Sequence, residues 1–187
     1  MNPEAPLRFW KRTRTFLVVL NALLIVADWT MAFYVYPRIP SPMAARLAIF
    51  GWSAGGFMTA WTVTQTHRYR VAVEGAGITD WLSFIPTSDI AQTDYDARWP
   101  EHDPEPFLKF SAVQFADQVT TPLLIMDGTA DVRVPTFQGR EFFILLAERK
   151  KTVKMVLYPG SPHFPVLWEQ RRDVWNQVRE WLDKHNP

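Results

Sequence analysis

The chain has 187 residues and a formal net charge of +1, which suits one domain with one core and gives no electrostatic case for a nucleic-acid partner. It contains no cysteine, which excludes disulfides, thiolate catalysis and cysteine-based metal sites. The four histidines at positions 67, 102, 163 and 185 lack the spacing of metal ligands, so we expect neither a metal nor another cofactor.

Residues 1–42 form a basic and apolar segment that ends in a linker. Basic residues precede an apolar run over residues 16–36, which is long enough to cross a bilayer. Asn21 and Asp28 oppose that interpretation, because a charged side chain in mid-membrane costs about 2.5–3.5 kcal/mol on insertion scales. A membrane or export segment and a buried segment of soluble protein both stay open. The location is undetermined: cytoplasmic is slightly favoured, with membrane anchoring or export as the alternative.

The linker marks the one visible domain boundary. Three prolines within residues 37–42 cannot continue a helix or a central strand. We therefore expect a separate N-terminal segment, 1–42, and a domain over 43–187. Leucine and alanine without period-2 alternation favour a helix over residues 16–27. That helix would dock on an exposed sheet edge or enter a membrane, with oligomerisation as another way to cover the edge.

Strand-like and helix-like segments alternate after the linker. The apolar, strand-like runs are 47–50, 71–74, 122–126 and 152–158, and the helical patterns are 57–65, 135–150 and 166–185. Most of 75–104 is expected to be loop. In the last helix the residues expected to face inward are Leu167, Val174, Val178, Trp181 and Leu182. The alternation predicts an α/β fold, with a parallel sheet flanked by helices and right-handed crossovers.

Gly51, Ser53 and Gly55 fit the pattern G-x-S-x-G between the first strand and the first helix. A serine on such a sharp turn projects its hydroxyl above the sheet edge, and its neighbours must be small. The N–H of Ala54 opens the helix and can stabilise negative charge that develops beside the serine. The alternative is a tight turn with an incidental serine.

A nucleophilic serine needs a base, and the base needs an acid to orient it. The loop after strand 122–126 contains Asp127 and Asp131, and the loop after strand 152–158 contains His163. Both loops follow strands, at the edge where open parallel sheets place their sites. The residues alone leave both aspartates open as the acid.

Three segments, RLAIFGWSAGGFMTAW, TPLLIMDGTADVRVP and LYPGSPHFP, with GAGITDW between them, resemble the catalytic domain of the prolyl oligopeptidase family of serine peptidases. The similarity begins near Ala45 and is strongest to the acylaminoacyl-peptidase and dipeptidyl-peptidase branch. It implies an α/β-hydrolase-type sheet, here incomplete at its amino end. It also implies Ser53 as nucleophile, His163 as base and Asp131 as acid, because the family has histidine where Asp127 stands.

The chain departs from the family pattern in two places. Pro162 stands where glycine usually precedes the histidine, and no HGG-type segment is recognisable as a second oxyanion donor beside the Ala54 N–H. The resemblance implies a serine peptidase that acts on peptides or small acyl compounds. The alternatives are a small carboxylesterase, or an impaired fragment that serves as an interaction module. Separately, the aromatic residues Trp52, Trp81 and Trp99 are candidate substrate contacts, with ordinary core or surface packing as the alternative.

Overall fold

The computed structural model describes residues 46–90 and 103–186, which belong to one unit spanning residues 45–187. The membrane or export interpretation of residues 16–36, the helix expected over 16–27 and the role suggested for Trp99 all lie outside the described residues. They stay predictions.

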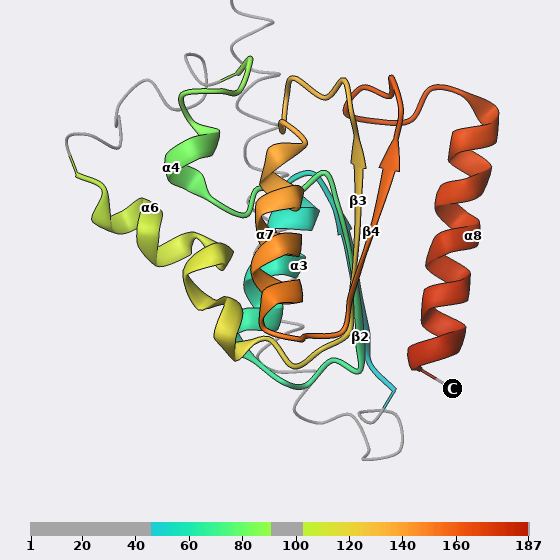
Figure 1. Cartoon of the computed structure of the whole chain (residues 1–187), viewed down its shortest axis with the longest axis horizontal. Helices are drawn as coiled ribbons and strands as arrows, with labels where there is room; N and C mark the ends of the chain where they lie inside the picture. Colours follow the sequence, from blue (N-terminus) through green and yellow to red (C-terminus); the bar gives the residue numbers. More distant parts are fainter. Residues whose placement is uncertain (1–45, 91–102, 187) are drawn as a thin grey trace, which may run out of the picture. The chain divides into compact units, whose positions relative to one another are not determined.

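A four-stranded parallel sheet forms the centre of the described unit (Figure 1). Its strands are β1 (Ala48–Trp52), β2 (Val71–Gly75), β3 (Leu123–Gly128) and β4 (Val153–Tyr158), each paired in parallel with the one before it. The strand order along the sheet is the order along the chain. The parallel sheet predicted from the alternating pattern is confirmed.

Helices cover both faces of this sheet (Figure 1). One core cluster joins β2 and β3 to the helices α3 (Ala54–Gln65) and α7 (Phe137–Glu148). A second cluster joins the opposite face to α8 (Trp168–His185). Every residue of β2 and β3 is buried, which explains why the run 122–126 has no polar alternation.

Among the described residues, three short helices lie between β2 and β3. They are α4 (Trp81–Phe84), α6 (Glu105–Phe110) and the 3-10 helix η3 (Ala112–Gln118). The first lies in the stretch expected to be mostly loop, and it forms because the carboxylate of Asp80 accepts hydrogen bonds from the N–H groups of Leu82 and Ser83.

The predicted boundaries of all three helices are wrong by two or three residues, and α7 (Phe137–Glu148) is two residues shorter at each end than the predicted 135–150. The first helix begins at Ala54 rather than at residue 57, because the turn at Ser53 leads directly into it. The last helix begins at Trp168, so Leu167 lies before it in extended backbone. Leu167 is 56% exposed and does not face inward as predicted. Val174, Val178 and Trp181 are buried as predicted, and Leu182 packs against them.

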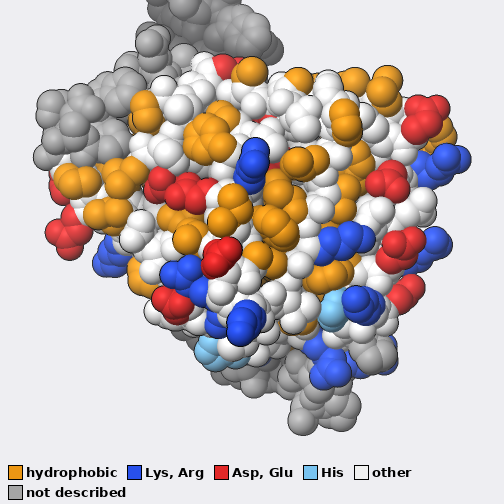
Figure 2. Space-filling view, viewed as in Figure 1, with side chains coloured by type: hydrophobic (Ala, Val, Ile, Leu, Met, Phe, Trp, Pro, Cys, Tyr) orange, Lys and Arg blue, Asp and Glu red, His pale blue; other side chains and the backbone are white. Residues whose placement is uncertain are grey.

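Charged side chains of both signs are interspersed on the face drawn in Figure 2, together with exposed hydrophobic ones. Within 46–90 and 103–186, no helix combines the length and the apolar character needed to cross a membrane. The same residues contain no group of three or more histidine, aspartate or glutamate side chains that could hold a metal ion.

Candidate active site

The turn between β1 and α3 holds Ser53 in a strained backbone conformation. Its φ is 60° and its ψ is −120°, which a residue with a side chain rarely adopts. The Ser53 N–H donates to the Gly75 carbonyl at 2.8 Å, and the Phe57 N–H donates to the Ser53 carbonyl at 2.9 Å. These two hydrogen bonds fix the turn to β2 on one side and to the first turn of α3 on the other.

Glycine is required at two positions around this turn, but the second motif glycine is not one of them. A Cβ on Gly51 would lie 2.1 Å from the Gly55 carbonyl oxygen, and a Cβ on Gly56 would lie 2.5 Å from the Gly75 carbonyl oxygen. A Cβ on Gly55 would meet nothing within 4 Å. The expectation that every neighbour must be small therefore holds for Gly51 and Gly56. Ala54 is exposed at the first position of α3, where backbone N–H groups lack intrahelical acceptors.

The loop after β3 orients Asp131. One carboxylate oxygen, Oδ1, accepts hydrogen bonds from the N–H groups of Arg133 at 2.8 Å and Val134 at 3.0 Å. The side chain is fully buried, so these bonds hold it in one orientation and leave Oδ2 directed at the loop that follows β4.

The loop after β4 carries His163, and it packs closely on the loop after β3. The Gly160 N–H donates to Thr129 Oγ1 at 2.8 Å, and the Ala130 N–H donates to the Ser161 carbonyl at 2.9 Å. A Cβ on Gly128 would lie 2.3 Å from that same carbonyl oxygen, so the close approach depends on glycine there.

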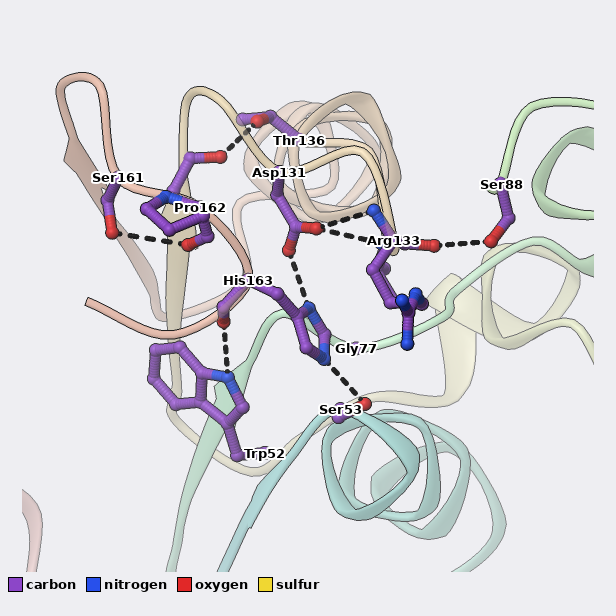
Figure 3. A network of polar contacts seen from close by, with 12 residues as sticks. Trp52, Ser53, Gly77, Ser88, Asp131, Arg133, Thr136, Ser161, Pro162 and His163 are labelled. Carbon is purple, nitrogen blue, oxygen red and sulfur yellow. Dashed lines mark hydrogen bonds and ion pairs between the residues drawn. The ribbon is translucent and has the colours of Figure 1, made fainter. Parts of the chain in front are cut away.

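Ser53, His163 and Asp131 meet in one chain of hydrogen bonds (Figure 3). Ser53 Oγ lies 2.8 Å from His163 Nε2, and His163 Nδ1 lies 2.7 Å from Asp131 Oδ2. Pro162 does not prevent this approach. The histidine side chain is 17% exposed, so the site is sheltered yet open to solvent at the imidazole.

Asp127, the other candidate acid, points away from His163. It lies on the α7 face of β3, where its Oδ2 atom is buried against Gly139 and has no hydrogen-bond partner among the described residues. Burial, reinforced by the nearby charge of Asp131, raises the pKa of Asp127 to about 8. The structure therefore pairs His163 with Asp131 rather than with Asp127.

Glu74 lies on the neighbouring strand β2 and shares this buried environment. Its residue is 0% exposed, and one carboxyl oxygen accepts a hydrogen bond from the Gly77 N–H. Burial, followed by the charge of Asp127, raises the pKa of Glu74 well above its ordinary value. Two buried carboxyl groups with raised pKa values thus lie on the neighbouring strands β2 and β3, and no motif in the sequence indicates them.

The two tryptophans suggested as substrate contacts have different surroundings. The Trp52 indole N–H donates to the His163 carbonyl at 2.8 Å, across 111 positions of the sequence. The Trp81 ring packs edge-on against Phe57 and Phe84, at 5.1 Å and 5.6 Å between ring centroids. Both are half-buried, and their contact with substrate stays a prediction.

The sequence does not predict an ion pair that lies at the rim of the site. Arg133 Nε lies 2.6 Å from Asp89 Oδ1, and the Ser88 hydroxyl donates to the Arg133 carbonyl at 2.6 Å. The hydrogen bond from Arg133 is the main cause that lowers the pKa of Asp89. These contacts connect the loop that holds Asp131 to the end of the stretch after α4.

Comparison with known proteins places the chain in a family. The model of the prolyl oligopeptidase family matches residues 43–186. The peptidase YuxL of Bacillus subtilis is 38% identical over 160 residues, which cover 79% of this chain and 23% of that protein. The human acylamino-acid-releasing enzyme is 32% identical over 152 residues, which cover 76% of this chain and 21% of the enzyme.

A solved structure gives the same result. The acylaminoacyl peptidase of Pyrococcus horikoshii superimposes with a TM-score of 0.71 at 26% identity, over 76% of this chain and 24% of that one. The chain thus spans less than a quarter of the length of these relatives. The shared region carries the α/β-hydrolase fold of these peptidases. Because the family model matches residues 43–186, which is more than three quarters of the chain, the chain belongs to the prolyl oligopeptidase family.

Proposed function

We propose that this chain is a serine peptidase that hydrolyses small peptides, with Ser53 as nucleophile, His163 as general base and Asp131 as the group that orients the base. The observation that carries the proposal is the unbroken hydrogen-bond chain from Ser53 Oγ through the imidazole to Asp131 Oδ2, at 2.8 Å and 2.7 Å. Relatives named as peptidases and acylamino-acid-releasing enzymes support a peptide substrate.

The reaction proceeds by acyl transfer through the serine. His163 Nε2 takes the hydroxyl proton while Ser53 Oγ attacks the carbonyl carbon, and Asp131 holds the imidazole by its Nδ1–H. The Ala54 N–H donates a hydrogen bond to the oxyanion that forms. The imidazolium then gives its proton to the leaving amine, and the C–N bond breaks to leave an acyl-serine.

Water completes the cycle. His163 takes a proton from the water molecule that attacks the acyl-serine, and it returns that proton to Ser53 Oγ when the ester bond breaks. The products are a carboxylic acid and the free enzyme. Asp127 takes no step in this sequence, because its side chain lies on the α7 face of β3, against Gly139.

The test is covalent labelling with a fluorophosphonate probe, which reacts only with an activated serine. We expect the chain to be labelled, Ser53→Ala to be unlabelled, and Asp131→Asn to lose about 10³–10⁴-fold in labelling rate because the imidazole loses its orienting partner. The matched control is Asp127→Asn, which we expect to label within a few-fold of the parent.

Two results would contradict the proposal. Failure of the parent to label would indicate an interaction module without an activated serine. A loss of labelling rate in Asp127→Asn as large as that in Asp131→Asn would show that Asp131 is wrongly assigned as the acid. Turnover of acyl nitrophenyl esters without turnover of short peptide anilides would favour a carboxylesterase over a peptidase.

A further inference from the structure

We propose that Trp52 is a positioning residue, which holds the His163 backbone so that the imidazole stays aligned with Ser53. The inference rests on the proposed function, since a positioned base has a purpose only where it removes a proton. It assigns to Trp52 a role that requires no contact with substrate.

The hydrogen bond from the Trp52 indole to the His163 carbonyl joins two halves of the site directly. Trp52 is the residue immediately before Ser53, and its Nε1 atom lies 2.8 Å from the carbonyl oxygen of the base residue itself (Figure 3). The side chain that precedes the nucleophile therefore contacts the backbone from which the base projects.

The indole is confined on two sides. Its ring stacks on Phe164 at 5.8 Å between centroids and 24° between planes. On another side it lies against Gly75, where a Cβ would come within 2.1 Å of the indole Cε3 atom. Gly75 is thus small because the indole occupies the space that a side chain would need, and a ring held in this way directs its N–H at one acceptor.

The contacts of the base loop with the loop after β3 hold residues that precede His163, and Arg171 Nε on α8 donates to the Pro165 carbonyl, two positions after it, at 2.7 Å. The Gly160 N–H donates to Thr129, and the Ser161 carbonyl accepts from Ala130. Beyond them comes Pro162 and then His163, whose carbonyl receives the Trp52 bond. Loss of this bond would leave the imidazole anchored through Asp131 while its backbone shifts, and small shifts of a reacting group strongly reduce rate.

The test is Trp52→Phe, which keeps an aromatic ring and removes the N–H donor. We expect kcat and the rate of fluorophosphonate labelling to fall about tenfold, since a misplaced base slows proton removal, while KM stays within about twofold. The matched control is Trp61→Phe on α3, where the parent ring packs against Phe110 and Phe115 instead of the site. We expect that variant to keep the parent rates within about twofold. Equal rates for Trp52→Phe and the parent would overturn the proposal.

A second measurement separates this inference from the proposed function. The ring resonances of His163, identified by their loss in His163→Ala, report the position of the imidazole whether or not the chain turns over substrate. If the fluorophosphonate probe does not label the parent, the proposed function is wrong. The His163 ring resonances then still test whether Trp52 positions the imidazole. Trp52→Phe should shift them and speed exchange of the Nδ1 proton, whereas unchanged resonances would overturn it.

A variant that keeps the indole covers the case in which Trp52→Phe does not fold. Phe164 is 58% exposed, so Phe164→Ala removes the stacked ring at little cost to the core. The indole then gains freedom, and we expect a smaller loss in kcat with KM steady. A kcat equal to that of the parent would contradict the proposal.

Discussion

At the scale of single residues, the two aspartates at the end of β3 and in the loop after it lie in different environments. Asp131 accepts hydrogen bonds from two backbone N–H groups and lies within hydrogen-bond distance of the His163 imidazole. All three contacts suit a carboxylate. Asp127, four positions earlier, is buried against Gly139 with one oxygen unpartnered among the described residues. The difference arises because Asp127 is still part of β3, whereas Asp131 lies in the loop after the strand has ended.

The raised pKa of Asp127 predicts how stability depends on pH. Its ordinary pKa is 3.8 and its folded value is about 8, so between these pH values the unfolded chain releases a proton that the folded chain keeps. The unfolded state then binds fewer protons, and stability falls as pH rises through this window. Below about pH 3.8 the Asp127 carboxyl has no effect on the free energy of unfolding, and above about pH 8 its destabilising effect is complete.

Asp127→Asn should remove this contribution, because the amide does not ionise. We expect the variant to gain stability over the parent between pH 5 and 8 by on the order of a few kcal/mol, measured by urea unfolding at each pH. Glu74 keeps its own raised pKa, so part of the slope remains. Asp183→Asn, at an exposed position of α8, is the control and should leave the slope unchanged. A parallel pH profile for Asp127→Asn and the parent would contradict the prediction.

At the scale of elements, the tight β1–α3 turn depends on contacts between backbone atoms. A Cβ on Gly51 would reach into the backbone of Gly55, which cannot move aside as a flexible side chain could. A Cβ on Gly55 points into open space from within a helix. Of the two glycines of the motif, the structure therefore requires Gly51 and tolerates a side chain at Gly55.

Alanine at each motif glycine should have opposite effects on stability. We expect Gly51→Ala to destabilise the fold by about 1–3 kcal/mol through overpacking, with a large loss of labelling at Ser53. Gly55→Ala should stabilise by about 0.5–1 kcal/mol, since alanine loses less entropy in a helix. Urea unfolding of both variants measures the difference, and equal destabilisation would show that the turn is arranged differently.

The strands and the three site residues could be predicted from the sequence because each leaves a local signal. Buried strands appear as apolar runs, and Ser53 and His163 lie within recognisable motifs. The bond from Trp52 to His163 leaves no such signal, because it joins residues 111 positions apart. The same holds for Gln138, whose buried amide accepts hydrogen bonds from the N–H groups of Thr79 and Asp80.

The short helices escaped prediction for another reason. α6 has six residues and η3 has seven, which is fewer than two turns of an α-helix, so neither displays an apolar periodicity. Leu167 was misplaced because an apolar residue next to a helix start continues the helical pattern although the backbone there is extended.

At the scale of the whole molecule, the site lies in loops at one edge of a four-stranded sheet, and within residues 46–90 and 103–186 few elements lie beside it to hold a long substrate. Remote binding contacts accelerate chemistry only where a surface exists to make them. The side chain of Val132, next to Asp131 in the chain, is exposed and suits short apolar acyl groups.

The described residues therefore predict a preference for small substrates. We expect turnover of nitrophenyl esters and short peptide anilides, and little cleavage of casein over the same time. The measurement compares initial rates on the three substrates, with Ser53→Ala as the blank. Efficient cleavage of casein without ester turnover would contradict the expectation.

The strand order has a consequence for how the molecule is made. Each strand pairs with the strand synthesised just before it, so the sheet can grow by one strand at a time as the chain leaves the ribosome. The nucleophile and its base are 110 positions apart, and the base follows the last strand. A nascent chain would thus carry Ser53 without its base until the loop after β4 has been synthesised. We expect the reactivity of Ser53 to begin only after β4 has paired with β3.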